Sequence, residues 1–374
     1  MSLKMIKVPF VDFSRIPTEV LEEQKRVASQ VIESGHFVGG PVVAQFEEEW
    51  ATAIGSKFAV GVGNGLDGLV IALKALGIGN GDLVAVPTHT FIATWNAVVL
   101  AGATPIGIDV DKYGLMDLSI LESDSRNFSA VIPVHMHGMM VDMARLNRWA
   151  NQKAVLVIED ASQAHFAVSE GISAGATSDV GVFSLYPSKN LGALGDAGIN
   201  VTSSIELAEK MRSYRNYGAS NDDKYFHTCF GVNSRLDSMQ AAFLSVNLKY
   251  LRAWNEYRTR IAHLYIQNLR PNENFSLLNP GIQASVWHHF AILTNDRTAL
   301  QKYLIEHGVQ TEIHYPHLAS AEFARIAGES PSPAPMGEYI SNQILSLPIS
   351  PWHTEEQILY VCEVLNKFNS PLVK

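Results

Sequence analysis

The chain has 374 residues, 47% of them hydrophobic, and its 28 basic and 37 acidic side chains give a net charge of −9. This length suffices for two domains with buried cores. The acidic balance excludes a general nucleic-acid binder, because no surplus of positive charge is present to neutralise phosphates. The two cysteines, Cys229 and Cys362, form no Cys-x-x-Cys pair. We therefore expect neither a disulfide framework nor a thiolate zinc site, and predict a reducing, cytoplasmic compartment.

Neither a signal peptide nor a membrane span is expected. The segment Met1–Lys7 is positive but leads into Val8–Asp12 instead of a long apolar stretch. The longest stretch without Lys, Arg, Asp or Glu, Leu83–Ile108, contains two prolines and several polar residues. It therefore predicts elements of a soluble core and not a membrane-spanning helix.

The first 250 residues predict an α/β domain. An amphipathic helix is expected over Pro17–Glu33. After it, short β-branched runs predict strands at Phe58–Val62, Leu83–Val86, Thr104–Ile108, Ala130–Val134, Ala154–Ile158 and Val180–Leu185. Helical patterns between them predict helices at Leu69–Leu76, Ile92–Ala101 and Met143–Ala150. This alternation is typical of a mostly parallel sheet covered by helices on both faces.

The remaining residues predict a smaller α+β domain. The pattern indicates a long helical stretch from Asp237 to about Leu269, a strand at Val286–Leu293, and helices at Thr298–His307 and Thr354–Phe368. We therefore expect an N-terminal arm and helix over residues 1–34, a large domain over 35–245, and a linking helix with a small C-terminal domain over 246–374.

A glycine motif, Gly63–Gly68, follows one predicted strand and opens a helix. It matches the G-x-G-x-x-G pattern of dinucleotide sites, in which glycines let backbone N–H groups approach a phosphate at a helix N-terminus. The acidic residue that would bind the ribose, Asp82, stands before the next strand and not at its end. The motif on its own therefore leaves two alternatives, a site for one phosphate or a tight turn without a ligand.

A carboxylate and a lysine follow two of the predicted strands. Asp160 ends the apolar run that begins at Val155, at a position where open α/β sheets bind ligands. Lys189 lies in the turn after the next strand, where loss of solvent favours the neutral amine that forms a Schiff base with carbonyls. A carboxylate, a lysine, nearby hydroxyl groups and a phosphate-ready helix are what pyridoxal 5'-phosphate requires.

Several segments resemble the DegT/DnrJ/EryC1/StrS family of nucleotide-sugar aminotransferases over nearly the whole chain. The matching segments are Val8–Asp12, Pro87–Thr94, Glu159–His165, Phe183–Gly192, Gly231–Asp237 and Leu345–Ile349. The resemblance implies the α/β fold of the fold-type I, aspartate aminotransferase-like enzymes. That fold has a large domain with a mostly parallel sheet and a smaller C-terminal α+β domain.

The resemblance also implies roles around the cofactor. Lys189 would bind pyridoxal 5'-phosphate covalently and carry the proton during amino transfer. Asp160 would pair with the pyridine nitrogen, Gln163 would reach the ring hydroxyl, and Phe91 would stack on the ring. The residues implied to hold the phosphate are Ser184 and the backbone amides of Gly65 and Leu66. Asn233 matches an asparagine that family members supply to the cofactor site from the other subunit, so the resemblance implies a homodimer with shared active sites.

Three positions depart from the pattern of the family. One is Ala197, because Asp196–Gly198 reads Asp-Ala-Gly where relatives have Asp-Gly-Gly, and this change affects the loop behind the lysine. Leu66 stands where many relatives have threonine, so it can offer the phosphate only its backbone N–H, and Phe166 replaces a usual glycine. Some relatives carry histidine in place of the lysine and dehydrate sugars. This chain keeps Lys189, which favours amino transfer.

Within the family, the chain looks most like enzymes that aminate the third carbon of dTDP-linked 3-keto-6-deoxyhexoses with L-glutamate as donor. The candidate contacts with the sugar nucleotide are Tyr186, Lys224, His314 and Tyr315. Three alternatives remain at this point: amination at the fourth carbon, an NAD-dependent oxidoreductase, and a regulatory protein without catalysis.

Metal catalysis is disfavoured, because the neighbouring histidines, such as His288 and His289, have no carboxylate at ligand spacing.

Overall fold

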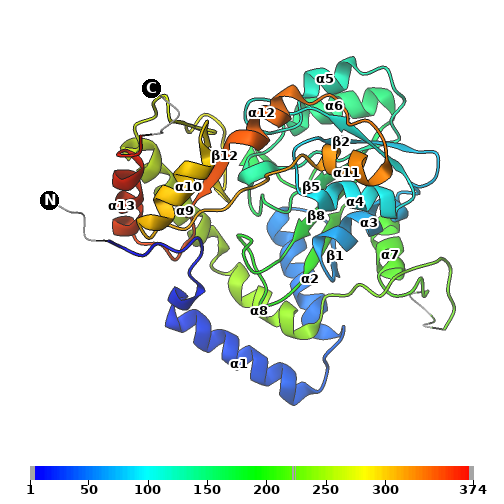
Figure 1. Ribbon diagram of the computed structural model, residues 1–374. Coiled ribbons are helices and arrows are strands. Elements are labelled where there is room, and N and C mark those ends of the chain that lie inside the picture. The colour runs from blue at the N-terminus through cyan, green and yellow to red at the C-terminus, as the bar shows by residue number, and fades with distance from the viewer. Residues whose placement is uncertain (1–4, 221–222, 224, 370–374) are drawn as a thin grey trace.

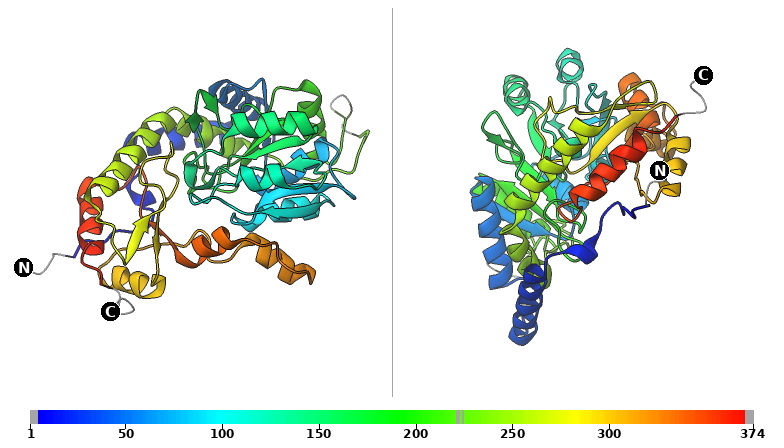
Figure 2. Two further views of the ribbon diagram at one scale, coloured as in Figure 1. Left: turned by 90° about the horizontal axis from the view of Figure 1, so that it is seen from above. Right: turned by 90° about the vertical axis from the view of Figure 1, so that its left-hand side faces the viewer.

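The computed structural model describes residues 5–220, 223 and 225–369. Its centre is a seven-stranded sheet (Figures 1 and 2). In spatial order the strands are β1 (Phe58–Val62), β9 (Gly198–Thr202), β8 (Val180–Ser184), β5 (Leu156–Asp160), β4 (Ala130–Val131), β2 (Leu83–Pro87) and β3 (Thr104–Ile108). Strand β9 runs antiparallel to both of its neighbours, and the other pairs are parallel. The expected α/β fold with a mostly parallel sheet is confirmed.

Helices bury the sheet from both sides (Figure 2). On one face, apolar side chains of α3 (Gly65–Ala75), α4 (Ile92–Leu100) and α7 (Ile205–Tyr214) share a core with the strands. The opposite face packs against α2 (Pro41–Ile54), α5 (Leu118–Ser123), α6 (Met143–Lys153) and α8 (Ser238–Leu248). Two short elements lie in the connections, the 3-10 helix η2 (Met136–Gly138) and the hairpin of β6 (Val168–Ser169) and β7 (Ile172–Ser173).

A second core surrounds an antiparallel sheet of β10 (Phe275–Leu277), β11 (Phe290–Thr294) and β12 (Ile344–Leu347). The helices that cover it are α9 (Leu251–Asn268), α10 (Arg297–Glu306) and α13 (Glu355–Leu365). The short helices α11 (Ala319–Ala327) and α12 (Pro335–Gln343) lead back over the larger sheet, and α11 places Phe323 against Trp95 of α4. At the other end of the chain, η1 (Phe13–Arg15) precedes α1 (Thr18–Ser34), which lies beside α8 (Figure 1). The domain boundaries stay a prediction.

The predicted long helix from Asp237 to Leu269 is wrong, because the chain forms α8 and α9 with a break between them. The backbone N–H groups of Lys249 and Tyr250 bond to carbonyls three residues back, and this tighter turn ends α8 before Leu251 opens α9. The strand predicted over Ala130–Val134 is also shorter than expected. Pro133 has no N–H to donate, and pairing resumes only as the single bridge between Val134 and Asp160.

Other elements differ in extent or were not predicted. The strand expected at Ala154–Ile158 lies two residues later, so that Asp160 is its last residue. The strand expected at Val286–Leu293 begins only at Phe290. Strand β9 and helices α2, α5, α7, α11 and α12 were not predicted. In the described part of the chain, no helix is both long and apolar enough to cross a membrane.

Gly198 of β9 provides a test of how tightly this sheet packs against the turn before α3. A Cβ atom at this position would lie 2.6 Å from the carbonyl oxygen of Asn64 and 3.0 Å from the backbone nitrogen of Gly65. We expect Gly198→Ala to lower the free energy of unfolding by about 1–3 kcal/mol, the usual cost of overpacking. Urea unfolding would measure it. The control is Gly79→Ala, where the nearest atom is 3.6 Å away, and equal stability of the two variants would contradict the prediction.

Candidate active site

A cavity of about 400 Å³ lies at the carboxyl ends of strands β5 and β8, at the junction with the smaller core. Both the large sheet and the segments around β11 contribute to it. Among the residues that line it are Gly65, Leu66, Phe91, Thr94, Asp160, Gln163, Ser184, Tyr186, Lys189, His288, His289, His314 and Tyr315. The cavity therefore brings together ten of the twelve predicted site residues, and the two others are Asn233 and Lys224.

Lys189 is half-buried in the turn after β8, where its backbone N–H donates to the carbonyl of Tyr186. Burial lowers the pKa of its amine to about 8, although the negative charge of Asp160 acts in the opposite direction. A large fraction of the amine is therefore neutral near pH 8, and a neutral amine is the form that attacks a carbonyl carbon.

The carboxylate of Asp160 is held by two donors at the end of β5. The Thr94 hydroxyl donates to Oδ2 over 2.9 Å, and the backbone N–H of Ser162 donates to Oδ1 over 3.2 Å. The side chain is only 6% exposed. These two hydrogen bonds fix the orientation of the carboxylate, which lines the cavity. Thr94 was not predicted to have a role, although it closes the segment Pro87–Thr94 that carries the resemblance.

The start of α3 forms a cradle for an anion beside Ser184. Asn64 caps the helix by accepting a hydrogen bond from the N–H of Asp67, while Gly65 and Leu66 line the cavity. A side chain at Gly65 would bring its Cβ within 3.0 Å of the Cβ of Ser184. Glycine thus lets the helix terminus, with its unpaired N–H groups, lie close to the serine.

The geometry contradicts the dinucleotide alternative. The carboxylate of Asp82, which would have to bind a ribose, accepts hydrogen bonds from the N–H of Gly79 (2.8 Å) and the hydroxyl of Ser129 (2.6 Å). Gly68 is needed for packing, because a Cβ there would lie 2.6 Å from the side-chain oxygen of Asn200. Asp82 and Gly68 are therefore both used in local structure and packing, and neither is available for a dinucleotide.

Aromatic and amide groups form the wall near Asp160. The ring of Phe91 is 53% exposed and lies 5.4 Å from the ring of Tyr315, centroid to centroid. Gln163 accepts a hydrogen bond from the backbone N–H of His137 (2.7 Å) and donates one to the Tyr315 hydroxyl (3.2 Å). Burial raises the pKa of Tyr315 far above its usual range, and the charge of Asp160 raises it further, so the phenol stays protonated at neutral pH.

Three histidines, His288, His289 and His314, line the side of the cavity formed by the smaller core. The rings of His289 and His314 stack with 3.8 Å between centroids. Burial lowers the pKa of all three, that of His314 to about 4, so they are neutral hydrogen-bonding groups at physiological pH. The sequence suggested a role for His314 alone. Within the described residues, no group of three or more side chains is arranged to hold a metal ion.

Two predicted residues do not line the cavity. Asn233 is exposed and pairs through its backbone with Asn216, outside the cavity of its own chain. Lys224 lies outside the described residues. The geometry of one chain therefore leaves both of these roles as predictions.

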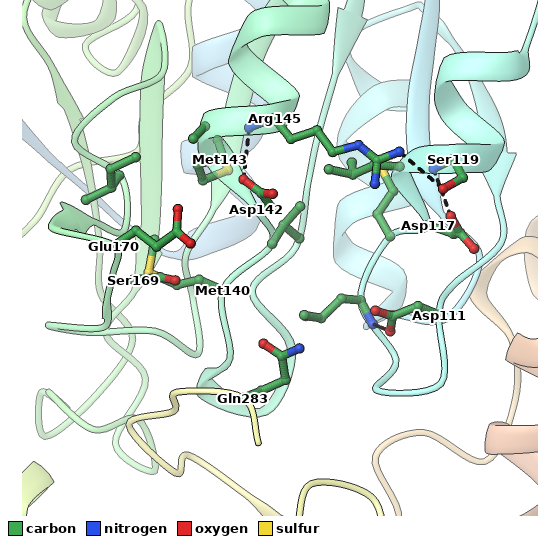
Figure 3. A pocket seen from close by; sticks show the side chains of 16 residues that line it. Asp111, Asp117, Ser119, Met140, Asp142, Met143, Arg145, Ser169, Glu170 and Gln283 are labelled. Atoms are coloured by element: carbon green, nitrogen blue, oxygen red, sulfur yellow. Dashed lines mark hydrogen bonds between the residues drawn. The ribbon is translucent and has the colours of Figure 1, made fainter. Parts of the chain in front are cut away.

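A second cavity, of about 450 Å³, is lined by a different set of residues (Figure 3). Three of its charged side chains already have structural partners. Asp142 caps α6 and Asp117 caps α5, while Arg145 forms an ion pair with Glu122. It contains no lysine or histidine. We therefore assign the chemistry to the cavity that contains Lys189.

Comparisons with known proteins find similar proteins over nearly the whole chain. Residues 18–366 match the model of the DegT/DnrJ/EryC1/StrS aminotransferase family. The dTDP-3-amino-3,4,6-trideoxy-alpha-D-glucose transaminase of Streptomyces venezuelae is 39% identical over 97% of this chain and 96% of the relative. The dTDP-3-amino-3,6-dideoxy-alpha-D-galactopyranose transaminase of Aneurinibacillus thermoaerophilus is 38% identical over 96% and 99%.

A solved structure is similar over the same length. It is the crystal structure of S. venezuelae DesV in complex with a ketimine intermediate. The two folds superpose with a TM-score of 0.92 at 38% identity, over 96% of this chain and 98% of DesV. Together with the sheet described above, this confirms the expected fold of fold-type I pyridoxal-phosphate transferases.

The lowered pKa of Lys189 is directly measurable. In protein freed of cofactor, we expect acetic anhydride to label Lys189 with a midpoint near pH 8, because the neutral amine reacts and its fraction rises as the pH passes the pKa. Asp160→Asn removes the charge that raises this pKa, so the midpoint should move below 8. Peptide mass spectrometry would follow both, with exposed Lys153 as internal reference. A midpoint near 10 in both proteins would contradict the burial argument.

Proposed function

The chain belongs to the DegT/DnrJ/EryC1/StrS aminotransferase family, and we propose that it transfers the amino group of L-glutamate to the 3-keto group of a dTDP-linked 3-keto-6-deoxyhexose. The product would be a dTDP-3-amino-3,6-dideoxyhexose, used to glycosylate a surface polysaccharide or a natural product. The names of the two relatives support this choice, because both denote dTDP sugars with an amino group on the third carbon. They differ in the rest of the sugar, so the substrate is proposed as a class.

The observation that carries the proposal is that a partly desolvated amine, a carboxylate and a helix N-terminus line the same cavity. The cofactor is pyridoxal 5'-phosphate, which supplies an electron-withdrawing ring that stabilises the charge left when a proton leaves the substrate carbon. The fit is chemical: Asp160 suits a protonated ring nitrogen, and Gly65, Leu66 and Ser184 suit a phosphate. Gln163 and Phe91 are proposed to contact the ring hydroxyl and the ring face.

Lys189 is proposed as the group that moves the proton. Its Nζ atom has no hydrogen-bond partner among the described residues and opens onto the cavity. With a pKa of about 8, Nζ can take a proton from the amino-bearing carbon of the donor. It can then deliver that proton to the carbon on the other side of the transferred nitrogen. A single group with a pKa near the working pH suits both directions of the transfer.

The proposal includes a homodimer. Asn233 would complete the active site of the neighbouring subunit, and the sugar nucleotide would be contacted by Tyr186, Lys224, His314 and Tyr315. Exposed apolar side chains around Asn233 support an interface there: Tyr217, Phe226, Phe230 and Val232. A reducing, cytoplasmic compartment is also proposed, in keeping with the free thiols of Cys229 and Cys362.

The proposed function is tested by product analysis. With L-glutamate and a dTDP-3-keto-6-deoxyhexose, we expect 2-oxoglutarate and a sugar whose third carbon bears nitrogen, as read by two-dimensional NMR. A dTDP-4-keto-6-deoxyhexose should be a poor acceptor. Amination of the 4-keto sugar in preference would favour the alternative enzyme of the family, and amination of neither would refute the assigned substrate class.

Variants of two lysines provide the control. Lys189→Ala should reduce turnover by a factor on the order of 10²–10⁴ or more, because the proton carrier is removed. Lys153→Ala changes an exposed lysine at the end of α6 and should keep full activity. Substantial turnover by a folded Lys189→Ala variant would show that another group moves the proton.

A further inference from the structure

The imidazole of His288 is held by a chain of hydrogen bonds whose direction is determined by backbone carbonyls. Asn255 donates from Nδ2 to the carbonyl oxygen of His165 over 2.8 Å. Asn190 donates from Nδ2 to the carbonyl oxygen of Val286 over 2.9 Å and to Oδ1 of Asn255 over 2.8 Å. Because a carbonyl oxygen only accepts, both amides can adopt a single orientation.

This orientation determines where His288 carries its proton. Oδ1 of Asn190 can only accept, and it lies 3.1 Å from Nδ1 of His288, so Nδ1 is the protonated nitrogen. Burial holds the pKa of His288 well below its usual value, and the positive charge of Lys189 lowers it further. The ring is therefore neutral, and Nε2 carries a lone pair without a proton.

The free nitrogen opens onto the cavity. His288 is 6% exposed and lines the same cavity as Lys189. Nε2 has no hydrogen-bond partner among the described residues. It is also accessible, since it is absent from the fully enclosed polar atoms without a partner. The wall of the cavity that Lys189 lines thus presents an oriented acceptor, and a ligand that displaces water from this nitrogen has to supply a donor in its place.

Close to the reacting carbons, few groups of the two substrates can act as that donor. The thymine N–H and the deoxyribose hydroxyl of a dTDP-sugar are donors too, but the diphosphate separates them from the hexose. The carboxylates of glutamate and the keto oxygen of the sugar offer only lone pairs, which His288 would repel. The amino group of glutamate is a donor, but it is the group transferred and loses its hydrogens in the reaction. The hydroxyl groups of the sugar keep theirs throughout.

We propose that Nε2 of His288 accepts a hydrogen bond from a sugar hydroxyl on a carbon next to the one that receives the amino group. His288 would then be a specificity-determining residue, and Asn190 the residue that sets its tautomer. The inference rests on the proposed function, because it needs a keto-sugar as acceptor. It predicts discrimination against deoxysugars, since a substrate without that hydroxyl leaves the buried nitrogen unpaired.

The test compares His288 variants on matched sugars. For the amination of a dTDP-3-keto-6-deoxyhexose, His288→Leu should lower kcat/KM roughly 2- to 10-fold, the worth of one neutral hydrogen bond. On the 2-deoxy or the 4-deoxy analogue, whichever lacks the contacted hydroxyl, it should have no effect. His288→Gln, which keeps an acceptor oxygen, should recover part of the loss. The formation of 2-oxoglutarate from glutamate in the first half-reaction should be unchanged in all variants.

Two controls separate the possible failures. His263→Leu changes an exposed histidine of α9 and should behave as wild type. An equal loss on all three sugars, or a loss in the glutamate half-reaction, would overturn the assignment of His288. Failure of the wild-type enzyme to aminate any 3-keto sugar would instead overturn the proposed function.

The tautomer can be measured without a variant. Two-bond ¹H–¹⁵N correlation spectra of the ¹⁵N-histidine-labelled holoenzyme, assigned with His288→Gln, should show His288 protonated at Nδ1. A proton on Nε2 would overturn the inference even if His288→Leu fails to fold.

Discussion

The chemistry proposed for this protein depends on one constraint, the partial removal of the Lys189 amine from water in a cavity that also contains the carboxylate of Asp160. Burial alone would lower the pKa of the amine further, and Asp160 restrains this effect, which leaves a value of about 8. An amine with this pKa exchanges protons readily at physiological pH. The carboxylate of Asp160 is held in place by hydrogen bonds from the Thr94 hydroxyl and the backbone N–H of Ser162.

The fold meets this constraint by bringing the ends of several strands to one edge. Asp160 ends β5, Ser184 ends the neighbouring β8, and Lys189 follows in the next turn. The smaller core closes the other side with neutral histidines and Tyr315, which exclude water without adding charge. The large sheet thus contributes Asp160 and Lys189 to the cavity, and the smaller core contributes neutral groups that can form hydrogen bonds.

The sequence was most informative where chemistry and local pattern coincide. Asp160 could be found because a carboxylate at the end of an apolar strand is uncommon. Lys189 could be found because the chain combines it with that carboxylate, nearby hydroxyl groups and a glycine-rich helix start, and the type of sheet followed from the alternation of elements. The chain from His165 to His288 could not be found, because it joins four segments that meet only in the folded protein. The break between α8 and α9 was also missed, since both helices have good helical composition.

Phe166 departs from the family glycine yet adopts a φ of 63° and stacks on Trp50, so aromatic packing offsets the cost of the left-handed backbone.

The central claim, that Lys189 is the amine that binds the cofactor, is tested most directly by trapping the attachment. The holoenzyme would be reduced with borohydride, digested, and its peptides analysed by mass spectrometry, with and without prior addition of glutamate. The account predicts a pyridoxyl group on Lys189, and a much smaller amount after glutamate has taken the cofactor to its amine form. Attachment to another lysine, or no attachment in a protein loaded with cofactor, would contradict it.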